Sequence, residues 1–203
     1  MDQDQNKRQM SKYQVFWNWF LKQAPYIYTQ LETDTENIAL DLTEKLKEVD
    51  DQLEFEIPFD FEEEYRELII SADGILDKFQ VVKELVSEAP DIPHWKITAF
   101  RPRLHQRNQI IDLDGISMDY HDVFFTYRET EEGLEVDAYI KGYDGSDNRY
   151  VHLYFLLLDS LIGEYDSVTV IKRTSLFPFE RSKGLYPFQE LLQIVDEYKN
   201  KKR

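Results

Sequence analysis

Cysteine is absent from this 203-residue chain, which excludes disulfide bonds, thiol nucleophiles and metal sites with thiolate ligands. Glycine is scarce, and its seven positions form neither a phosphate-binding loop nor a dinucleotide-binding fingerprint. The GxSxG and HExxH motifs of serine hydrolases and zinc proteases do not occur. The longest apolar run, residues 153–158, is far shorter than the roughly 20 residues that cross a membrane. These absences argue against the commonest enzyme classes and against a membrane protein.

Basic residues are also few, because 24 Lys and Arg stand against 40 Asp and Glu, a formal charge of −16. A field of this sign repels phosphate groups, so we expect no binding to nucleic acid or to anionic membranes. The 13 Phe, 13 Tyr and 3 Trp provide enough apolar surface for a packed core. The polar first ten residues lack the apolar segment of a signal peptide, which predicts a cytoplasmic protein. No motif indicates a cofactor, and none is expected.

Hydrophobic spacing predicts an α+β fold. We expect a disordered tail over residues 1–10 and a single domain over residues 11–203, with helices packed on a mixed or antiparallel sheet of about six strands. The predicted helices cover residues 11–23, 34–49, 79–89, 150–162 and 187–198. Ser11 and Gln14 have the spacing of a capping box at the start of the first helix, and Pro25 is expected to end it. The predicted strands cover residues 53–59, 68–70, 95–99, 123–127, 134–140 and 168–172. The strands over 123–127 and 134–140 are expected to pair as a hairpin, and residues 174–185 are expected to form a loop.

Two parts of this map have the same order of elements. Residues 53–101 and 123–173 each give strand, strand, helix and strand, which predicts two ββαβ (ferredoxin-like) repeats. A similar turn follows the second strand in each part, at residues 71–74 and 142–145. Duplication of one unit and the chance occurrence of two common units both explain the pattern.

Charged residues close each of these parts and suggest a ligand site. If the helix in each part joins two parallel strands, both strands end at the same edge of the sheet, where open sheets bind ligands. Arginine binds phosphate or carboxylate through paired hydrogen bonds. The alternative is a set of salt bridges within the protein. The predicted site for a small anionic ligand comprises Asp73, Arg101, Arg103, Asp144, Lys172 and Arg173.

A second cluster has the chemistry of a metal site. Asp112, Asp114, Asp119 and His121 lie close together in the sequence, and residues two apart share a face of an extended chain. Carboxylate oxygens with one imidazole suit Mg²⁺, Mn²⁺ or Ca²⁺. The alternative is that these residues form ordinary turns, because Asp and Gly favour turn conformations.

Three stretches suggest contacts with other molecules. Residues 32–67 hold 15 acidic and 3 basic residues, which fits either a docking face for a basic partner or a solvated surface. The aromatic residues of the first helix suit a core or a contact surface. The helix over residues 150–162 is apolar on both sides, so the side opposite the sheet needs a helix or a second subunit to cover it. One side comprises Val151, Phe155, Leu158 and Ile162, and the other comprises Leu153, Leu156 and Leu157.

Three segments carry a resemblance to a known family: Phe-Trp-Asn-Trp-Phe at residues 16–20, Ile-Ser-Ala-Asp-Gly at 70–74 and Trp-Lys-Ile-Thr-Ala-Phe-Arg-Pro-Arg at 95–103. Together they resemble an uncharacterised bacterial protein family over about the first half of the chain. The resemblance implies a bacterial cytoplasmic origin and no catalytic residue.

These observations lead to a hypothesis for function. The sequence favours a non-catalytic interaction or regulatory module that binds a protein partner or associates with itself. One alternative is an enzyme or sensor that binds a small anionic ligand at the strand ends. The other is a metal-dependent hydrolase that uses the Asp112–His121 cluster.

Overall fold

The computed structural model describes residues 10–58, 65–104, 109–180 and 184–202. It divides into two compact units, Met1–Ala99 and Phe100–Arg203, each of which is described by itself. The predicted α+β fold is confirmed. The single domain over residues 11–203 stays a prediction, and residues 1–9 of the predicted tail lie outside the described residues. No helix in the described ranges has the length and apolar character needed to span a membrane.

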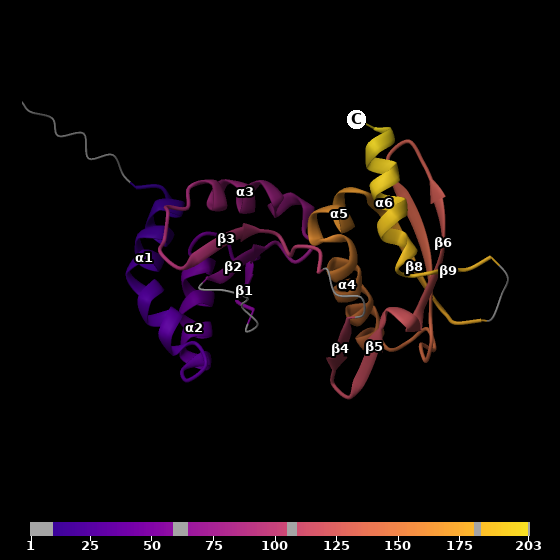
Figure 1. Ribbon diagram of the computed structural model, residues 1–203, viewed down its shortest axis with the longest axis horizontal. Coiled ribbons are helices and arrows are strands. Elements are labelled where there is room, and N and C mark those ends of the chain that lie inside the picture. The colour runs from indigo at the N-terminus through magenta and orange to yellow at the C-terminus, as the bar shows by residue number, and fades with distance from the viewer. Residues whose placement is uncertain (1–9, 59–64, 105–108, 181–183, 203) are drawn as a thin grey trace, which may run out of the picture. The chain divides into compact units, whose positions relative to one another are not determined.

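The first unit packs helices against a three-stranded sheet of order β1-β2-β3 (Figure 1). Strand β1 runs antiparallel to β2, and β3 runs parallel to β2 after the crossover through α3. Burial of the central strand explains its apolar character on both faces, since Leu68, Ile69 and Ile70 are all at most 3% exposed. The elements are α1 (Lys12–Gln30), α2 (Thr35–Lys47), β1 (Glu54–Glu56), β2 (Arg66–Ser71), the short 3₁₀ helix η1 (Leu76–Lys78), α3 (Phe79–Ser87) and β3 (Trp95–Ala99).

Helix α1 begins as predicted and ends later than predicted. Ser11 caps it in a capping box with Gln14. The predicted stop before Pro25 is wrong, because α1 continues to Gln30. Proline removes one N–H donor from the helix, and the buried side chains of Ala24 and Ile27 keep the apolar face continuous across that position. Tertiary burial therefore outweighs the loss of a single helical hydrogen bond.

The second unit contains a hairpin and a four-stranded sheet of order β8-β7-β6-β9. Strands β6 and β7 are antiparallel, and β8 is parallel to β7. Within this unit the helices α4, α5 and α6 lie on one side of the four-stranded sheet (Figure 1). The elements are β4 (Ile110–Leu113), β5 (Ile116–Asp119), the 3₁₀ helix η2 (Tyr120–Asp122), β6 (Val123–Glu129), β7 (Leu134–Ile140), α4 (Asn148–Ile162), α5 (Glu164–Thr169), β8 (Ile171–Pro178), β9 (Tyr186–Pro187) and α6 (Glu190–Lys201).

The described strands form three sheets in place of the expected sheet of about six strands. Both units contain an antiparallel strand pair followed by a helical crossover to a parallel strand, the order β1-β2-α3-β3 in one and β6-β7-α4-α5-β8 in the other. The second unit has two helices in its crossover where the sequence pattern predicts one, and the two ββαβ (ferredoxin-like) repeats stay a prediction. A common origin of the two units by duplication stays a prediction.

The segment after α4 departs from the sequence prediction. A strand was expected over residues 168–172 and a loop over 174–185, whereas α5 covers Glu164–Thr169 and β8 covers Ile171–Pro178. The carboxylate of Glu164 accepts a hydrogen bond from the backbone N–H of Arg101 at 3.0 Å, and Glu164 is fully buried. Such tertiary contacts stabilise a helical turn that the alternating spacing of Val168 and Val170 cannot indicate.

Candidate functional site

The parallel crossovers behind the predicted strand-end site are confirmed, for β2 with β3 and for β7 with β8. In the first unit, Asp73 follows β2 in a turn where Asp73 and Gly74 have positive φ angles of 47° and 77°. The backbone N–H of Asp73 donates to the hydroxyl of Ser71 at 2.9 Å. Arg101 follows β3 and belongs to the second unit. A site shared by Asp73 and Arg101 stays a prediction.

In the second unit, the predicted placement of the strand-end residues is wrong. Lys172 and Arg173 lie near the start of β8, where Arg173 is in register with Glu135. Asp144 follows the opposite end of β7, beyond Ile140. The length of β7 separates the two groups by roughly 20 Å, at about 3.3 Å per residue. The error comes from the predicted strand at 168–172, which placed the basic pair at a strand end.

Arg103 lies at the centre of a partly buried ion cluster. Its Nη2 donates to Asp166 at 2.6 Å, its Nη1 lies 2.8 Å from Asp196, and its Nε donates to the carbonyl of Ile162 at 2.8 Å. Lys199 donates to both oxygens of Asp166 at 2.7 Å. Desolvation opposes the charge on Arg103, but the hydrogen bonds to Asp196 and Asp166 outweigh it and raise the pKa of the guanidinium.

Arg101 also contacts the protein's own carboxylates. Its Nη1 lies 3.6 Å from Asp159, and its backbone carbonyl accepts from the N–H of Glu164 at 3.0 Å. Asp159 accepts a further hydrogen bond from Ser167 at 2.5 Å. These geometries fit the alternative of internal salt bridges, which tie Arg101 to the C-terminal end of α4. Binding of an anion by Arg101 or Arg103 stays a prediction.

The structure does not bring the four predicted metal ligands together. Asp114 occupies the turn between β4 and β5 with a φ of 46°, and Asp112 accepts a hydrogen bond from Ser117 at 2.5 Å. Asp119 caps η2 and accepts from the N–H of His121 at 2.6 Å. Across the described ranges, no three His, Asp or Glu side chains form a group that could hold a metal ion. The geometry matches the ordinary turn and cap roles of Asp.

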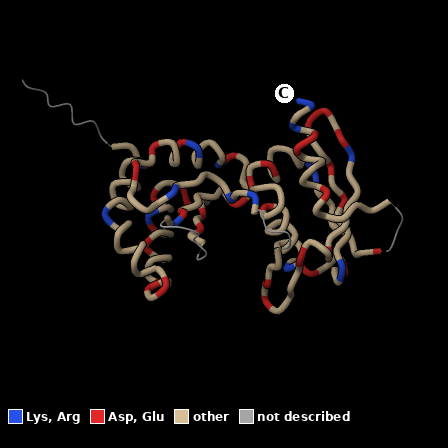
Figure 2. Tube along the Cα trace, in the orientation of Figure 1, with Lys and Arg blue, Asp and Glu red and all other residues tan. Residues whose placement is uncertain are grey.

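The acidic stretch over residues 32–67 contains many internal contacts, and residues 59–64 of it lie outside the described residues. In Figure 2, acidic residues are coloured red along the Cα trace, several of them in the part of the first unit that Figure 1 labels α2 and β1. Glu32 pairs with Arg66 at 2.6 Å, and Asp50 pairs with Lys78 at 2.8 Å. The hydrogen bond from Lys78 lowers the pKa of Asp50. These pairs reduce the repulsion between the carboxylates of this stretch.

A different surface was not foreseen. Strand register places nine side chains on the face of β8-β7-β6 that points away from the helices. We call this surface the outer face, and each of its side chains is half-buried or exposed. The outer face comprises Phe124, Thr126, Arg128, Glu135, Asp137, Tyr139, Arg173, Ser175 and Phe177.

One row of the outer face is aromatic. Phe124 of β6, Tyr139 of β7 and Phe177 of β8 are in register across the three strands. The rings of Tyr139 and Phe177 lie 5.5 Å apart, and Phe177 is 41% exposed. Phe179 packs on Phe124 at 4.9 Å, and the ammonium of Lys141 lies 5.5 Å from the Phe124 ring. The row therefore presents apolar ring surface to solvent beside a cation.

The opposite row of the outer face is charged. Arg128 and Arg173 lie on either side of Glu135, at 2.5 Å and 3.3 Å from its carboxylate. The hydrogen bond from Arg128 lowers the pKa of Glu135. The two arginine side chains are 72% and 57% exposed, and each guanidinium has five N–H donors, so both keep donors for a further acceptor.

One signal in the sequence could have identified the outer face. The hairpin prediction used the apolar positions of residues 123–127 and 134–140 and did not use the alternate positions. The alternate positions of β6 and β7 include Phe124 and Tyr139, and aromatic residues on a solvated strand face are typical of binding surfaces. This signal could not have identified the third strand of the face, because residues 174–178 of β8 were predicted to be a loop.

The first unit contains an apolar pocket of about 430 Å³. It lies where α1 meets the segment before β3, at the end of that strand opposite to the predicted ligand site. His94 adopts a left-handed φ of 65°, and its ring lies 5.4 Å from that of Tyr28. The lining residues are Leu21, Ala24, Pro25, Tyr28, Thr29, Ile92, Pro93 and His94.

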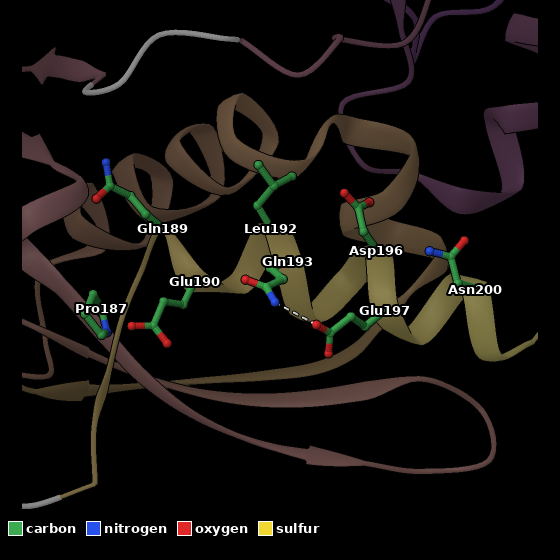
Figure 3. A pocket seen from close by; sticks show the side chains of 8 residues that line it. All are labelled: Pro187, Gln189, Glu190, Leu192, Gln193, Asp196, Glu197 and Asn200. Carbon is green, nitrogen blue, oxygen red and sulfur yellow. Dashed lines mark hydrogen bonds between the residues drawn. The ribbon is translucent and has the colours of Figure 1, made fainter.

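A wider groove of about 600 Å³ runs along α6. Its lining side chains project from Pro187 of β9, from Gln189 and from α6 in Figure 3, and they include both amides and carboxylates. Gln193 donates to Glu197 at 2.7 Å, and Asp196 is already held by Arg103.

No protein-family model, curated protein or solved structure matches this chain. The resemblance of the first half to a bacterial family therefore stays a prediction.

Proposed function

We propose that this protein is a non-catalytic, cytoplasmic interaction module that binds a protein partner on its outer face. The observation that carries the proposal is the open aromatic row of Phe124, Tyr139 and Phe177. A sheet face without a covering layer ordinarily presents polar side chains to water. Exposed aromatic residues in one row instead offer rigid apolar surface of the kind that dominates protein interfaces.

The charged row indicates the chemistry of the partner. Arg128 and Arg173 retain N–H donors that a carboxylate can engage, and each lies four residues along its strand from the aromatic row. A partner segment with apolar side chains and a carboxylate matches both rows. Stacked bases of a single-stranded nucleic acid would also fit aromatic rings, but the chain charge of −16 opposes the approach of a polyanion.

A crosslinking experiment identifies the partner. A photo-crosslinking amino acid replaces Tyr139 in cells that make the protein, and the same residue at Tyr165 is the control. Tyr165 is 40% exposed and lies in α5, away from the outer face. We expect a protein adduct at position 139 that is absent at position 165. Equal adducts at both positions, or a nucleic-acid adduct at position 139, would overturn the proposal.

Calorimetry with the purified partner then measures the contribution of the face. Tyr139→Ser removes an aromatic anchor and is expected to weaken binding by at least about 10-fold. Tyr165→Ser removes a tyrosine of similar chemistry and is expected to bind as the wild type does. Equal affinities for the two variants would contradict the role of the outer face.

A second candidate function rests on the pocket of the first unit. A volume of about 430 Å³ suits a small ligand. The lining is mainly apolar, and His94 and Tyr28 are the lining residues that carry a polar ring group. We propose a small aromatic or aliphatic ligand with one hydrogen-bonding group. Titration with indole, followed by NMR of the His94 ring, should give saturable shifts. Shifts that are absent, or that grow linearly with indole, would rule this candidate out.

A further inference from the structure

Strand β8 forms one edge of the four-stranded sheet. It is eight residues long, which exceeds the mean strand length of about 5–6 residues. In the part of the chain that the structure describes, β7 is the strand that pairs with it. An edge strand directs alternate backbone N–H and C=O groups away from its sheet, where another strand can bind them.

The side chains of β8 are complementary to themselves. Arg173, Ser175 and Phe177 share the outer face, and Thr174 and Leu176 share the opposite face. An antiparallel copy centred on Ser175 would bring Arg173 opposite Phe177 and Thr174 opposite Leu176. Each pair then joins residues of the same face, and each guanidinium meets an aromatic ring, a favourable cation–π arrangement.

We propose that β8 pairs with β8 of a second copy of this chain across a two-fold axis at Ser175. The two sheets then form one continuous sheet of eight strands. The proposal does not depend on the outer face binding another partner.

The charge distribution favours a second copy as the occupant. The charged side chains of β8, Lys172 and Arg173, lie near its start, and residues 174–178 carry no charge. A two-fold axis makes the pair antiparallel, so the charged end of one strand meets the uncharged end of the other. Basic residues on edge strands usually prevent unwanted pairing. Here they oppose a parallel pair, which would place Arg173 against Arg173, and they permit the antiparallel one.

The contact involves a single strand from each copy. It is therefore smaller than the roughly 800 Å² per partner of a stable complex. We expect a monomer–dimer equilibrium that depends on protein concentration, and sedimentation velocity over a range of concentrations measures it.

Two variants at one position test the register. Phe177→Arg places a cation opposite Arg173 of the other copy, at both ends of the pair. Phe177→Glu places an anion there and loses the same ring contact with Tyr139. We expect Phe177→Arg to weaken the dimer by at least about 10-fold and Phe177→Glu to preserve it. A wild type that is monomeric at every concentration, or equal weakening by both variants, would overturn the proposal.

A disulfide provides a second test that leaves Phe177 unchanged. The chain has no cysteine, so Ser175→Cys introduces a single thiol. Opposed residues of an antiparallel pair lie about 4.5–5.5 Å apart between Cα atoms, a distance that a disulfide spans. With copper phenanthroline and air as oxidant, the variant should form a covalent dimer on a non-reducing gel. Thr126→Cys, on the interior strand β6, is the control, and crosslinking at the same rate in both variants would refute the pairing.

Discussion

Asp166 shows how a carboxylate becomes part of the interior of this protein. Its side chain is 9% exposed and accepts hydrogen bonds from both Arg103 and Lys199. Asp196 also binds Arg103, but its side chain is 47% exposed. The same cation therefore has one buried and one solvated partner, which makes a direct comparison of the two possible.

We expect Asp166→Asn to lower the free energy of unfolding by about 2 kcal/mol, because it leaves two cations without their shared anion. The partial exposure of Arg103 and Lys199 keeps the effect below that of a fully buried pair. Asp196→Asn should lower it by less than about 1 kcal/mol, since water replaces that contact. Urea denaturation measures both, and similar losses for the two variants would contradict the importance of burial.

Tyr120 illustrates an unpaired polar group in the core of the second unit. It is 3% exposed, and its hydroxyl has no hydrogen-bond partner among the residues that the structure describes. Desolvation raises the pKa of Tyr120 to about 12. Tyr13 has a pKa raised to about 12 as well, by desolvation and by its hydrogen bond to Glu84. The two tyrosines thus differ in whether the hydroxyl is satisfied.

Tyr120→Phe should raise the free energy of unfolding at neutral pH by about 1 kcal/mol, because it removes a buried hydroxyl without a partner. Tyr13→Phe should lower it, because it removes a hydrogen bond. In the wild type, the stabilisation from the raised pKa of Tyr120 is complete below pH 10 and is lost as the pH rises toward 12, at up to about 1.4 kcal/mol per unit. Denaturation between pH 9 and 12 should give a shallower decline for Tyr120→Phe, and an unchanged slope would contradict this account.

At the scale of elements, α4 shows that hydrophobic periodicity predicts a helix but does not predict which of its apolar residues are buried. The sequence grouped Phe155 with Leu158 and Ile162 on one apolar side of the helix. Leu158 and Ile162 are each 1% exposed, whereas Phe155 is 45% exposed. On the other side of the helix, Leu153 and Leu157 are fully buried, as the sequence predicts. A helix that is apolar all round therefore leaves open which residues the neighbouring elements cover.

Leu157→Asp should lower the free energy of unfolding by more than about 4 kcal/mol, because it buries an unpaired charge in the core of the second unit. Phe155→Asp, on the exposed side of the same helix, should cost only about 1 kcal/mol. Thermal and urea denaturation of both variants check the difference. A folded Leu157→Asp variant with near-native stability would show that the assigned burial is wrong.

Over the whole molecule, charge is unevenly divided between the two units. Residues 1–99 hold 22 acidic and 10 basic residues, a net charge of −12, and residues 100–203 hold 18 and 14, a net charge of −4. Repulsion between like charges destabilises a compact state, and dissolved salt screens it. The described ion pairs lose strength under the same screening, so the two effects have opposite signs.

We expect repulsion to dominate, so that raising NaCl from about 0.01 to 1 M, which shortens the screening length from about 30 to 3 Å, raises the melting temperature. A gain of about 1 kcal/mol corresponds to about 2–4 °C for a chain of this size. Differential scanning calorimetry measures the shift. A melting temperature that falls with NaCl would show that the ion pairs outweigh the repulsion.

We also expect excess EDTA to leave the melting temperature unchanged, because the four predicted metal ligands do not form a cluster. Calorimetry with and without Mg²⁺, Mn²⁺ or Ca²⁺ provides the control. A fall of many degrees on chelation would restore the metal interpretation of residues 112–121.

The amino-acid sequence by itself determined the α+β class and most of the elements, because hydrophobic spacing and turn residues act over a few neighbours. The capping box at Ser11 and the alternation of residues 134–140 are local signals of this kind, and both predictions hold.

Tertiary structure decided the other features of the fold. Helix α1 continues past Pro25 because its apolar face is buried, and α5 replaces a predicted strand because Glu164 binds the backbone of a distant segment. Because α5 replaces the predicted strand, Lys172 and Arg173 lie at the start of a strand, where the sequence placed them at its end. This replacement separates them from Asp144, and it places β8 at the sheet edge beside Tyr139. The alternating spacing of β6 and β7 indicates Phe124 and Tyr139 of the outer face, but contacts between residues far apart in the chain decided that β8 completes it.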